Sequence, residues 1–355
     1  ILSHLSLLLI VFFFIQSCST DSVSDIEIED AIEDDMDNPI EDPMDEIDDT
    51  EESETGTITF EDGLFIIGKL SYFGRHEHFV EDHTIINALS NNLPAPYESF
   101  LSRSLIKGNE LFVHRHVDII LDAWVVFYRP IKIKHKLPKR LDEAQIRKLG
   151  EEMAFFHKAC HLIRNTLPKS SKNLNTDIQH LLEIVDSEFG SYEHRGREAV
   201  IKEQSKLFFE NLEKYQFHEL PKIPVFVDWN IGNFSVTKSA KLFSRWDYDW
   251  FRMSARIMDF YFLSRVVSDV GDRTVFVYNI GPLMEDRFIL FLKAYHQVFP
   301  LTKNEIFLLK EVYRFFILNY VIKDGRYFFH EIYASKLQQQ AYASYFDSIE
   351  KEFDG

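Results

Sequence analysis

The chain has 355 residues, long enough to form two lobes around a substantial core. Its formal net charge of -18 comes from one region, because residues 21–54 hold 18 of the 57 acidic residues and residues 1–54 contain no Lys or Arg. Residues 55–355 carry 39 acidic and 39 basic residues, so net charge gives no argument there for a nucleic-acid partner.

The N-terminus carries an apolar run over residues 5–15, too short to span a bilayer but typical of a signal-peptide core. It leads into Ile15-Gln16-Ser17-Cys18, which resembles a bacterial lipobox, where the cysteine takes lipid after cleavage. We therefore expect a lipoprotein signal peptide over residues 1–18 and membrane attachment through a lipidated Cys18. A signal peptide cleaved without lipidation stays open as an alternative.

The acidic residues that follow predict a disordered linker over residues 19–55, because dense like charge and little apolar surface cannot offset the entropy of ordering. If Met36 or Met44 is the true first residue, the protein is cytoplasmic instead. Apart from Cys18 the chain contains Cys160 alone, which we expect to be a packed helix residue.

Residues 56–130 predict a small β-rich lobe. Apolar runs at Thr57–Phe60 and Leu64–Leu70 predict a hairpin, and His78–Asn91 a helix. Two further strands are expected at Glu110–Arg115 and Trp124–Tyr128.

Residues 131–355 predict a larger, mostly helical lobe. Apolar residues from Ile146 to His157 recur at helical spacing, and further helices are expected at 176–188, at 197–214 and after Ile257. A short β-rich island at 224–247 interrupts them. This order predicts an α+β fold of two lobes, with the active site in the cleft between them.

The β island contains the residues that point to chemistry. Asn233–Thr237 and Lys241–Trp246 predict a hairpin, and pairing 237 with 241 places 233 opposite 245. Asn233 and Asp247 then meet at its open end, with Asp228 on the loop leading in. Phosphoryl transfer uses such a set: one carboxylate orients or deprotonates a hydroxyl, while an Asn oxygen and another carboxylate hold Mg²⁺.

Phe226-Val-Asp228-Trp-Asn-Ile-Gly-Asn233 and Trp246-Asp247-Tyr248-Asp249 resemble the catalytic and metal loops of the aminoglycoside phosphotransferase / choline kinase-like (protein-kinase-like) superfamily, which read His-Gly-Asp-x-x-x-x-Asn and Ile-Asp-Trp/Phe-Asp/Glu. The resemblance implies a two-lobed kinase-like fold and use of ATP and Mg²⁺. It assigns Asp228 as the catalytic base, Asn233 and Asp247 as metal ligands, and Asp249 as an additional metal-site residue.

Other segments extend this resemblance to about residues 64–345. Leu149-Gly150 with Ala154 and His157 is similar to a helix of the superfamily, and Asp259 resembles an Asp that braces the catalytic loop. The sequence departs from the superfamily at Phe226, where a loop-bracing His is usual.

The cation that would contact the nucleotide phosphates is predicted to be Lys69, with Glu81 as its helix partner and Arg75 as the competitor. Only about 14 residues that we expect to be ordered (55–68) precede Lys69, too few for a complete set of nucleotide-covering strands. Trp124–Tyr128 is the candidate strand for adenine contacts.

The pairs His76/His78 and His114/His116 would each project to one face of a strand, but no third metal ligand is recognisable. The leading hypothesis is a kinase that transfers the γ-phosphate of ATP to a hydroxyl of a small molecule. The alternative is a catalytically weak or inactive kinase-fold lipoprotein that acts as a binding module.

Overall fold

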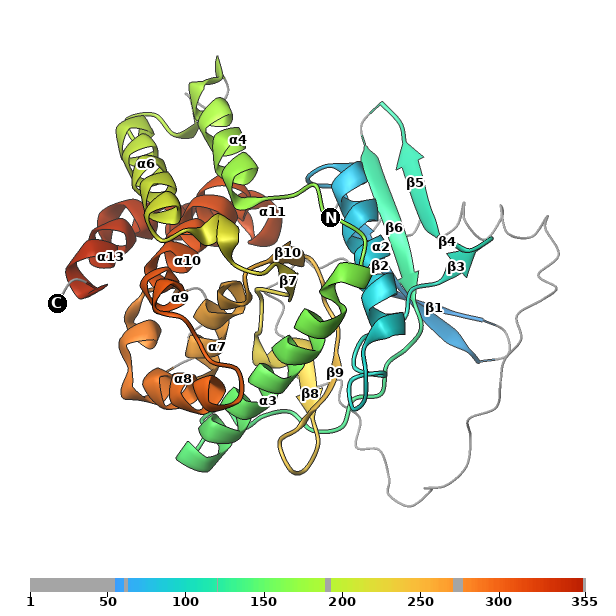
Figure 1. Cartoon of the computed structure of the whole chain (residues 1–355). Helices are drawn as coiled ribbons and strands as arrows, with labels where there is room; N and C mark the ends of the chain where they lie inside the picture. Colours follow the sequence, from blue (N-terminus) through green and yellow to red (C-terminus); the bar gives the residue numbers. More distant parts are fainter. Residues whose placement is uncertain (1–54, 61–62, 120, 189–192, 271–276, 354–355) are drawn as a thin grey trace.

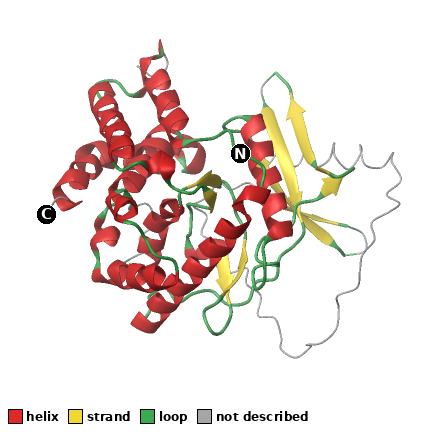
Figure 2. Cartoon of the chain, in the orientation of Figure 1, coloured by secondary structure: helices red, strands yellow, loops and turns green. Residues whose placement is uncertain are grey.

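The computed structural model describes residues 55–60, 63–119, 121–188, 193–270 and 277–353. A small antiparallel sheet with one helix forms one lobe and a larger group of helices forms the other (Figures 1 and 2). The predicted α+β architecture of two lobes is confirmed. The predicted signal peptide and nearly all of the acidic linker lie outside the described residues. Within the described ranges, no helix is long and apolar enough to cross a membrane.

The small lobe is a four-stranded sheet in the order β1-β2-β6-β5. Its strands are β1 (Thr55–Thr59), β2 (Phe65–Ser71), β5 (Val113–Val117) and β6 (Asp122–Tyr128). The predicted hairpin is β1–β2, which pairs Thr55 with Lys69 and Thr59 with Phe65. A short antiparallel pair of two-residue strands, β3 (Ile106–Lys107) and β4 (Glu110–Leu111), lies beside this sheet. Helix α2 (His76–Asn92) packs along the sheet, as Figure 1 shows.

The continuous apolar run of β6 is explained by burial on both faces of the sheet. Val126 and Tyr128 face the main core, while Val125 and Phe127 belong to a second, small cluster with Leu70. Successive side chains of a strand point to opposite faces, so a strand covered on both sides needs apolar residues at every position.

The larger lobe contains most of the helices. They are α3 (Glu143–Ile163), α4 (Leu174–Asp186), α6 (Glu198–Lys214), α7 (Phe260–Val267), α8 (Asp286–Val298), α9 (Lys303–Phe307), α10 (Leu309–Phe315), the π-helix η7 (Phe316–Lys323), α11 (Gly325–Phe328), α12 (Glu331–Gln340), the π-helix η8 (Ala341–Tyr345) and α13 (Phe346–Phe353). Short 3-10 turns join several of them: η1 (Arg164–Thr166), η2 (Phe217–Glu219), η3 (Ile231–Asn233), η4 (Arg256–Asp259) and η6 (Gly281–Met284).

Helix α3 confirms the expectation drawn from apolar spacing. Asp142 and Gln145 form a reciprocal capping box at its start, which satisfies backbone N–H groups that have no partner inside the helix. Its predicted inward residues, from Ile146 to His157, are buried, as is Cys160. A Cβ at Gly150 would lie 2.6 Å from the carbonyl oxygen of Phe291, so only glycine permits this approach of α3 to α8.

The β island forms two separate pairs of strands. β7 (Ile223–Val225) pairs with β10 (Arg252–Ser254), and β8 (Phe234–Val236) pairs with β9 (Leu242–Arg245). Both pairs are antiparallel. They bring residues 226–233 and 246–251, which connect the strands, to the side of the helical lobe that faces α2 and β2.

The expectation of strand histidines at 76 and 78 is wrong. Both residues lie in the first turn of α2, where positions two apart point in different directions. His114 and His116 do lie on one strand, β5, and both are partly exposed.

Candidate functional site

The β8–β9 hairpin follows the predicted register only near its turn. Val236 pairs with Leu242, and Thr237 N–H donates to the Lys241 carbonyl at 2.8 Å. A β-bulge then shifts the pairing by one residue, so Phe234, not Asn233, lies opposite Arg245. The backbone carbonyl of Asn233 accepts from the N–H of Trp246 at 3.1 Å, and Trp246 is the residue before Asp247.

The side chains of Asp228 and Asn233 are bonded to each other. The Asn233 amide Nδ2 donates to Asp228 Oδ2 at 2.8 Å, and the backbone N–H of Asn230 donates to Asp228 Oδ1 at 3.1 Å. Asp228 is partly exposed, while Asn233 is buried. Because the amide nitrogen is used for this bond, the side-chain oxygen of Asn233 is the atom left to act as a ligand.

Lys69 connects the small lobe to residues 246–249 of the helical lobe. Its Nζ lies 2.7 Å from Asp249 Oδ2 and 3.7 Å from Asp247 Oδ1, and its side chain is buried. Shielding from water raises the pKa of Asp249 to about 6; Lys69 opposes this rise, and the neighbouring Asp247 adds to it. Asp247 adopts a left-handed backbone conformation, with φ of 64°, and its Oδ1 accepts from the N–H of Asp249.

The predicted partner of Lys69 lies elsewhere. Glu81 accepts hydrogen bonds from Ser170 Oγ at 2.8 Å and from the N–H of Ser171 at 2.7 Å, so it holds the segment between α3 and α4. The predicted pairing of Lys69 with Glu81 is thus replaced by pairing with Asp249. The competitor, Arg75, is largely exposed and lies 4.0 Å from Glu77.

A different residue of α2, His83, faces the sheet close enough to Lys69 to be affected by its charge. It is buried and bonds to the hydroxyl of Tyr128 on β6. Burial, with the positive charge of Lys69, lowers the pKa of His83 to about 3, so this imidazole is neutral at physiological pH. Sequence spacing did not single out His83, because nothing local tells which helix residue faces the sheet.

Strand β6 pairs with β2 over residues 124–128 and with β5 over residues 122–126, and the carbonyl of Phe127 accepts from the N–H of Leu105. Its backbone N–H and C=O groups are therefore used within the sheet. The assignment of Trp124–Tyr128 as the strand that contacts adenine stays a prediction.

A buried carboxylate braces the loop that carries Asp228. Asp259 Oδ1 accepts from the backbone N–H groups of Phe226 and Val227 at 2.9 and 2.7 Å. Its Oδ2 lies 2.9 Å from His157 Nε2 on α3, whose Nδ1 bonds to Tyr295. The bracing role expected for Asp259 thus matches its contacts.

Val227 has a left-handed φ of 61°, although it is β-branched. Such residues rarely adopt this conformation, which costs on the order of 1–3 kcal/mol unless the surroundings hold it. The N–H of Val227 donates to Asp259, and this bond is one of the contacts that hold the left-handed conformation. Val227 is the residue immediately before Asp228.

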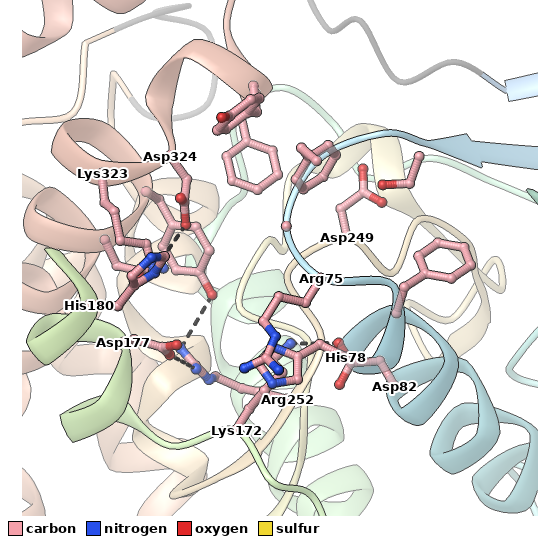
Figure 3. A pocket seen from close by; sticks show the side chains of 18 of the residues that line it. Arg75, His78, Asp82, Lys172, Asp177, His180, Asp249, Arg252, Lys323 and Asp324 are labelled. Atoms are coloured by element: carbon pink, nitrogen blue, oxygen red, sulfur yellow. Dashed lines mark hydrogen bonds and ion pairs between the residues drawn. The ribbon is translucent and has the colours of Figure 1, made fainter. Parts of the chain in front are cut away.

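A cavity of about 510 Å³ opens between the two lobes beside Asp249. Figure 3 shows that residues of α2, α4, β10 and η7 point into it. Most of its charges are paired: Lys172 with Asp82, Arg252 with Asp177 and Lys323 with Asp324. Aromatic side chains complete the wall; they are Phe73, Phe79, Tyr248, Tyr320, Tyr327 and Phe328.

Two buried acceptor atoms on this wall have no hydrogen-bond partner within the described residues: Asp82 Oδ1 and Asn319 Oδ1. Burial raises the pKa of Asp82, against the effect of Lys172. Buried polar atoms normally have partners, so a molecule with hydrogen-bond donors would complete this wall.

No family model matches the sequence, and no curated protein matches it. Two solved structures do resemble the chain. An amicoumacin kinase in complex with AMP-PNP, Ca²⁺ and Ami aligns with a TM-score of 0.55 at 14% identity, over 84% of this chain and 85% of that one. A microcompartment-associated aminopropanol kinase aligns with a TM-score of 0.54 at 16% identity, over 84% and 91%. The chain has the fold of these kinases. The kinase-like fold implied by the sequence motifs is confirmed.

Proposed function

We propose that this chain is an ATP- and Mg²⁺-dependent phosphotransferase that moves the γ-phosphate to a hydroxyl of a small molecule. One observation carries the proposal: Asp228 is bonded to Asn233, Lys69 is paired with Asp247 and Asp249, and the backbone N–H of Trp246, which donates to the carbonyl of Asn233, joins these two groups between the lobes. Carboxylates, an amide and a buried lysine are the groups that phosphoryl transfer requires.

Asp228 would be the catalytic base. Its two oxygens are oriented by Asn233 and by the backbone N–H of Asn230, and its partial exposure leaves it accessible to a substrate. A carboxylate held in this way can orient an acceptor hydroxyl and take its proton as the phosphoryl group arrives.

Asn233, Asp247 and Asp249 would hold Mg²⁺. Within the described ranges, no three His, Cys, Asp or Glu side chains form a metal cluster, so the site would combine two carboxylates with an amide oxygen. Such hard oxygen donors suit Mg²⁺, which keeps several waters or phosphate oxygens as its other ligands. Burial is the main cause of the raised pKa of Asp249, and a divalent cation bound beside it would favour its ionised form. Bound there, Mg²⁺ would neutralise charge that develops on the phosphates.

Lys69 would contact the nucleotide phosphates, since it is the buried cation closest to the metal loop in the contacts above. In the structure it offsets the charge of Asp249 and Asp247. Its ion pairs would loosen when Mg²⁺ takes over that task.

The acceptor would bind partly in the cavity beside Asp249 and extend its hydroxyl toward Asp228, which is not among the residues that line this cavity. A volume of about 510 Å³ suits a small molecule, and the free acceptor atoms of Asp82 and Asn319 suit one that carries amino or hydroxyl groups. The names of the two similar kinases give natural probes: amicoumacin and aminopropanol.

The test is nucleotide binding. The melting temperature of the wild-type protein should rise with millimolar Mg²⁺–AMP-PNP and not with AMP-PNP in EDTA, because the metal loop recognises the pair. Asp247→Ala should abolish the rise. Asp186→Ala, which removes an exposed carboxylate paired with Lys202 at the C-terminal end of α4, is the matched control and should keep it.

Absence of any shift in the wild type would contradict the proposal. A Mg²⁺-dependent shift without ADP formation from ATP, across a panel of amino alcohols and aminoglycosides, would favour the alternative of a non-catalytic binding module.

The proposal includes membrane attachment through Cys18. Mass analysis of the mature N-terminus tests it: a diacylated or triacylated Cys18 is expected, and an intact or shorter N-terminus without lipid would contradict it.

A further inference from the structure

Arg245 is a fully buried residue at the end of β9, two residues before Asp247. Its Nη2 donates to the backbone carbonyl of Asp228 at 2.6 Å and lies 3.5 Å from the carbonyl of Asp247. One guanidinium group therefore reaches the main chain of the base and, more weakly, of the metal loop.

The loop of the base encloses this guanidinium from two sides. The Arg245 Cζ lies 4.6 Å from the centre of the Phe226 ring and 4.4 Å from that of Trp229, and these rings flank Asp228 in the sequence. Cations over aromatic faces are attracted by the ring quadrupole, more strongly when water is excluded. Phe226 thus contributes to the loop through Arg245 although its own side chain has no hydrogen-bonding group.

The position of Arg245 is itself fixed from the small-lobe side. The backbone N–H of Arg245 donates to the carbonyl of Phe100 at 2.7 Å, and its backbone carbonyl accepts from the hydroxyl of Tyr248 at 3.0 Å. The same hydroxyl accepts from the N–H of Ser102. The segment that follows α2 is therefore connected, through β9, to the loop that carries Asp228 and the loop that carries Asp247, the two functional loops.

Burying this charge is costly for the fold. Nε and Nη1 of Arg245 are buried without a partner among the described residues, and replacing a buried ion by a well-packed apolar side chain is often neutral or stabilising. Burial lowers the pKa of Arg245, while Asp228, Asp259 and Asp247 act in the opposite direction, so the group stays a cation. If the role of this residue were purely structural, an apolar side chain would serve as well or better.

We infer that Arg245 is a positioning residue that holds the main chains of Asp228 and Asp247 in register, so that the base and the metal ligand keep a fixed separation. The inference rests on the proposed function for its catalytic consequence. Asp259 secures the other side of the same loop at the N–H groups of Phe226 and Val227.

The test compares Arg245→Met with Arg265→Met. Arg265 on α7 is also a buried guanidinium, 3% exposed, and its Cζ lies over the rings of Phe262 and Tyr278, at 5.5 and 4.2 Å from their centres, which belong to neither loop. It controls for the loss of a buried, ring-stacked cation.

For Arg245→Met we expect kcat, or affinity for Mg²⁺–AMP-PNP, to fall roughly 10- to 100-fold, with little change in melting temperature. Arg265→Met should leave both functional quantities unchanged. Arg245→Lys keeps the charge but not the fork of donors, and should lie between Arg245→Met and the wild type. In Arg245→Ala, millimolar guanidinium should restore part of the activity, whereas equal sodium chloride should not.

Hydrogen exchange separates a failure of this inference from a failure of the proposed function. The N–H groups of Asp228, Asn230 and Asn233 are bonded within the loop and should exchange faster in Arg245→Met but not in Arg265→Met. If the wild type binds no nucleotide, the proposed function fails, and exchange still decides whether Arg245 holds the loop. Equal exchange in both variants, or an Arg245→Met protein with wild-type kcat, would overturn the inference.

Discussion

The two regions that make up the site are held together in different ways. Residues 226–259 of the helical lobe form a dense local unit, in which Asp228 bonds to Asn233 and both Asp259 and Arg245 hold its loop. The small lobe contributes chiefly Lys69, which joins this unit through ion pairs to Asp249 and Asp247.

This difference explains where sequence motifs were informative. In the local unit, the residues that meet are 5 to 33 positions apart within one stretch of the chain, so their spacing restricts where they can lie. Lys69 and Asp249 are 180 positions apart, and their meeting depends on how the lobes pack. The expected Lys69–Glu81 pair failed for that reason.

The largest effect should come from the centre of the local unit. Asp228→Asn removes the carboxylate of the proposed base but keeps a side chain that can bond to Asn233, so kcat should fall about 10²- to 10⁴-fold. Affinity for Mg²⁺–AMP-PNP, measured by calorimetry, should stay near the wild-type value. Unchanged ADP formation would show that Asp228 is not the base.

Lys69→Met and Glu81→Gln test the contrast between the lobes. Loss of a charge-assisted bond to phosphate of roughly 1.5–3 kcal/mol should weaken nucleotide affinity about 10- to 100-fold in Lys69→Met. Glu81→Gln should leave affinity unchanged and reduce the free energy of unfolding by about 1 kcal/mol, because Ser170 and Ser171 lose a charged acceptor. If Lys69→Met and Glu81→Gln weakened nucleotide affinity equally, the result would support the Lys69–Glu81 pairing expected from the sequence.

Gly150→Ala tests the packing that carries His157 and, through it, Asp259. The added Cβ would meet backbone atoms of α8, and we expect about 1–3 kcal/mol of destabilisation despite a helix-propensity gain of about 1 kcal/mol. Chemical denaturation measures the change. Gly232→Ala is the control, since nothing lies within 4 Å of a Cβ there. A Gly150→Ala protein as stable as the wild type would show that α8 moves aside freely.

The smallest effect we expect is on the pH dependence of stability. Arg256 binds Glu305 through two bonds, at 2.7 and 3.0 Å. Burial alone would raise the pKa of Glu305, but the bonds from Arg256 and Thr302 outweigh it and the pKa is lowered. The stabilisation is therefore complete above the unfolded pKa, about 4.3, and is lost as the pH falls through the lower folded value.

Glu305→Gln should accordingly be less stable than the wild type at pH 7, and the difference should shrink below about pH 4. Thermal melts across pH 3–7 measure it. A difference that stays constant over this range would show that the charge of Glu305 does not matter.

The sequence by itself determined the two-lobed architecture, the β1–β2 hairpin, helix α3 and the grouping of Asp228, Asn233 and Asp247, because periodicity and short spacings restrict neighbours along the chain. It could not determine the bulge that moves Asn233 opposite Trp246, which depends on how β8 and β9 pair in three dimensions.

Only the tertiary structure decided the partner of Lys69, the cavity beside Asp249 and the place of Arg245. A lone Arg in a short apolar strand was a visible signal, yet its meaning depends on rings and carbonyls that fold around it. The cost of burying a charge is met only by groups that packing brings close, and their identity cannot be obtained from local pattern alone.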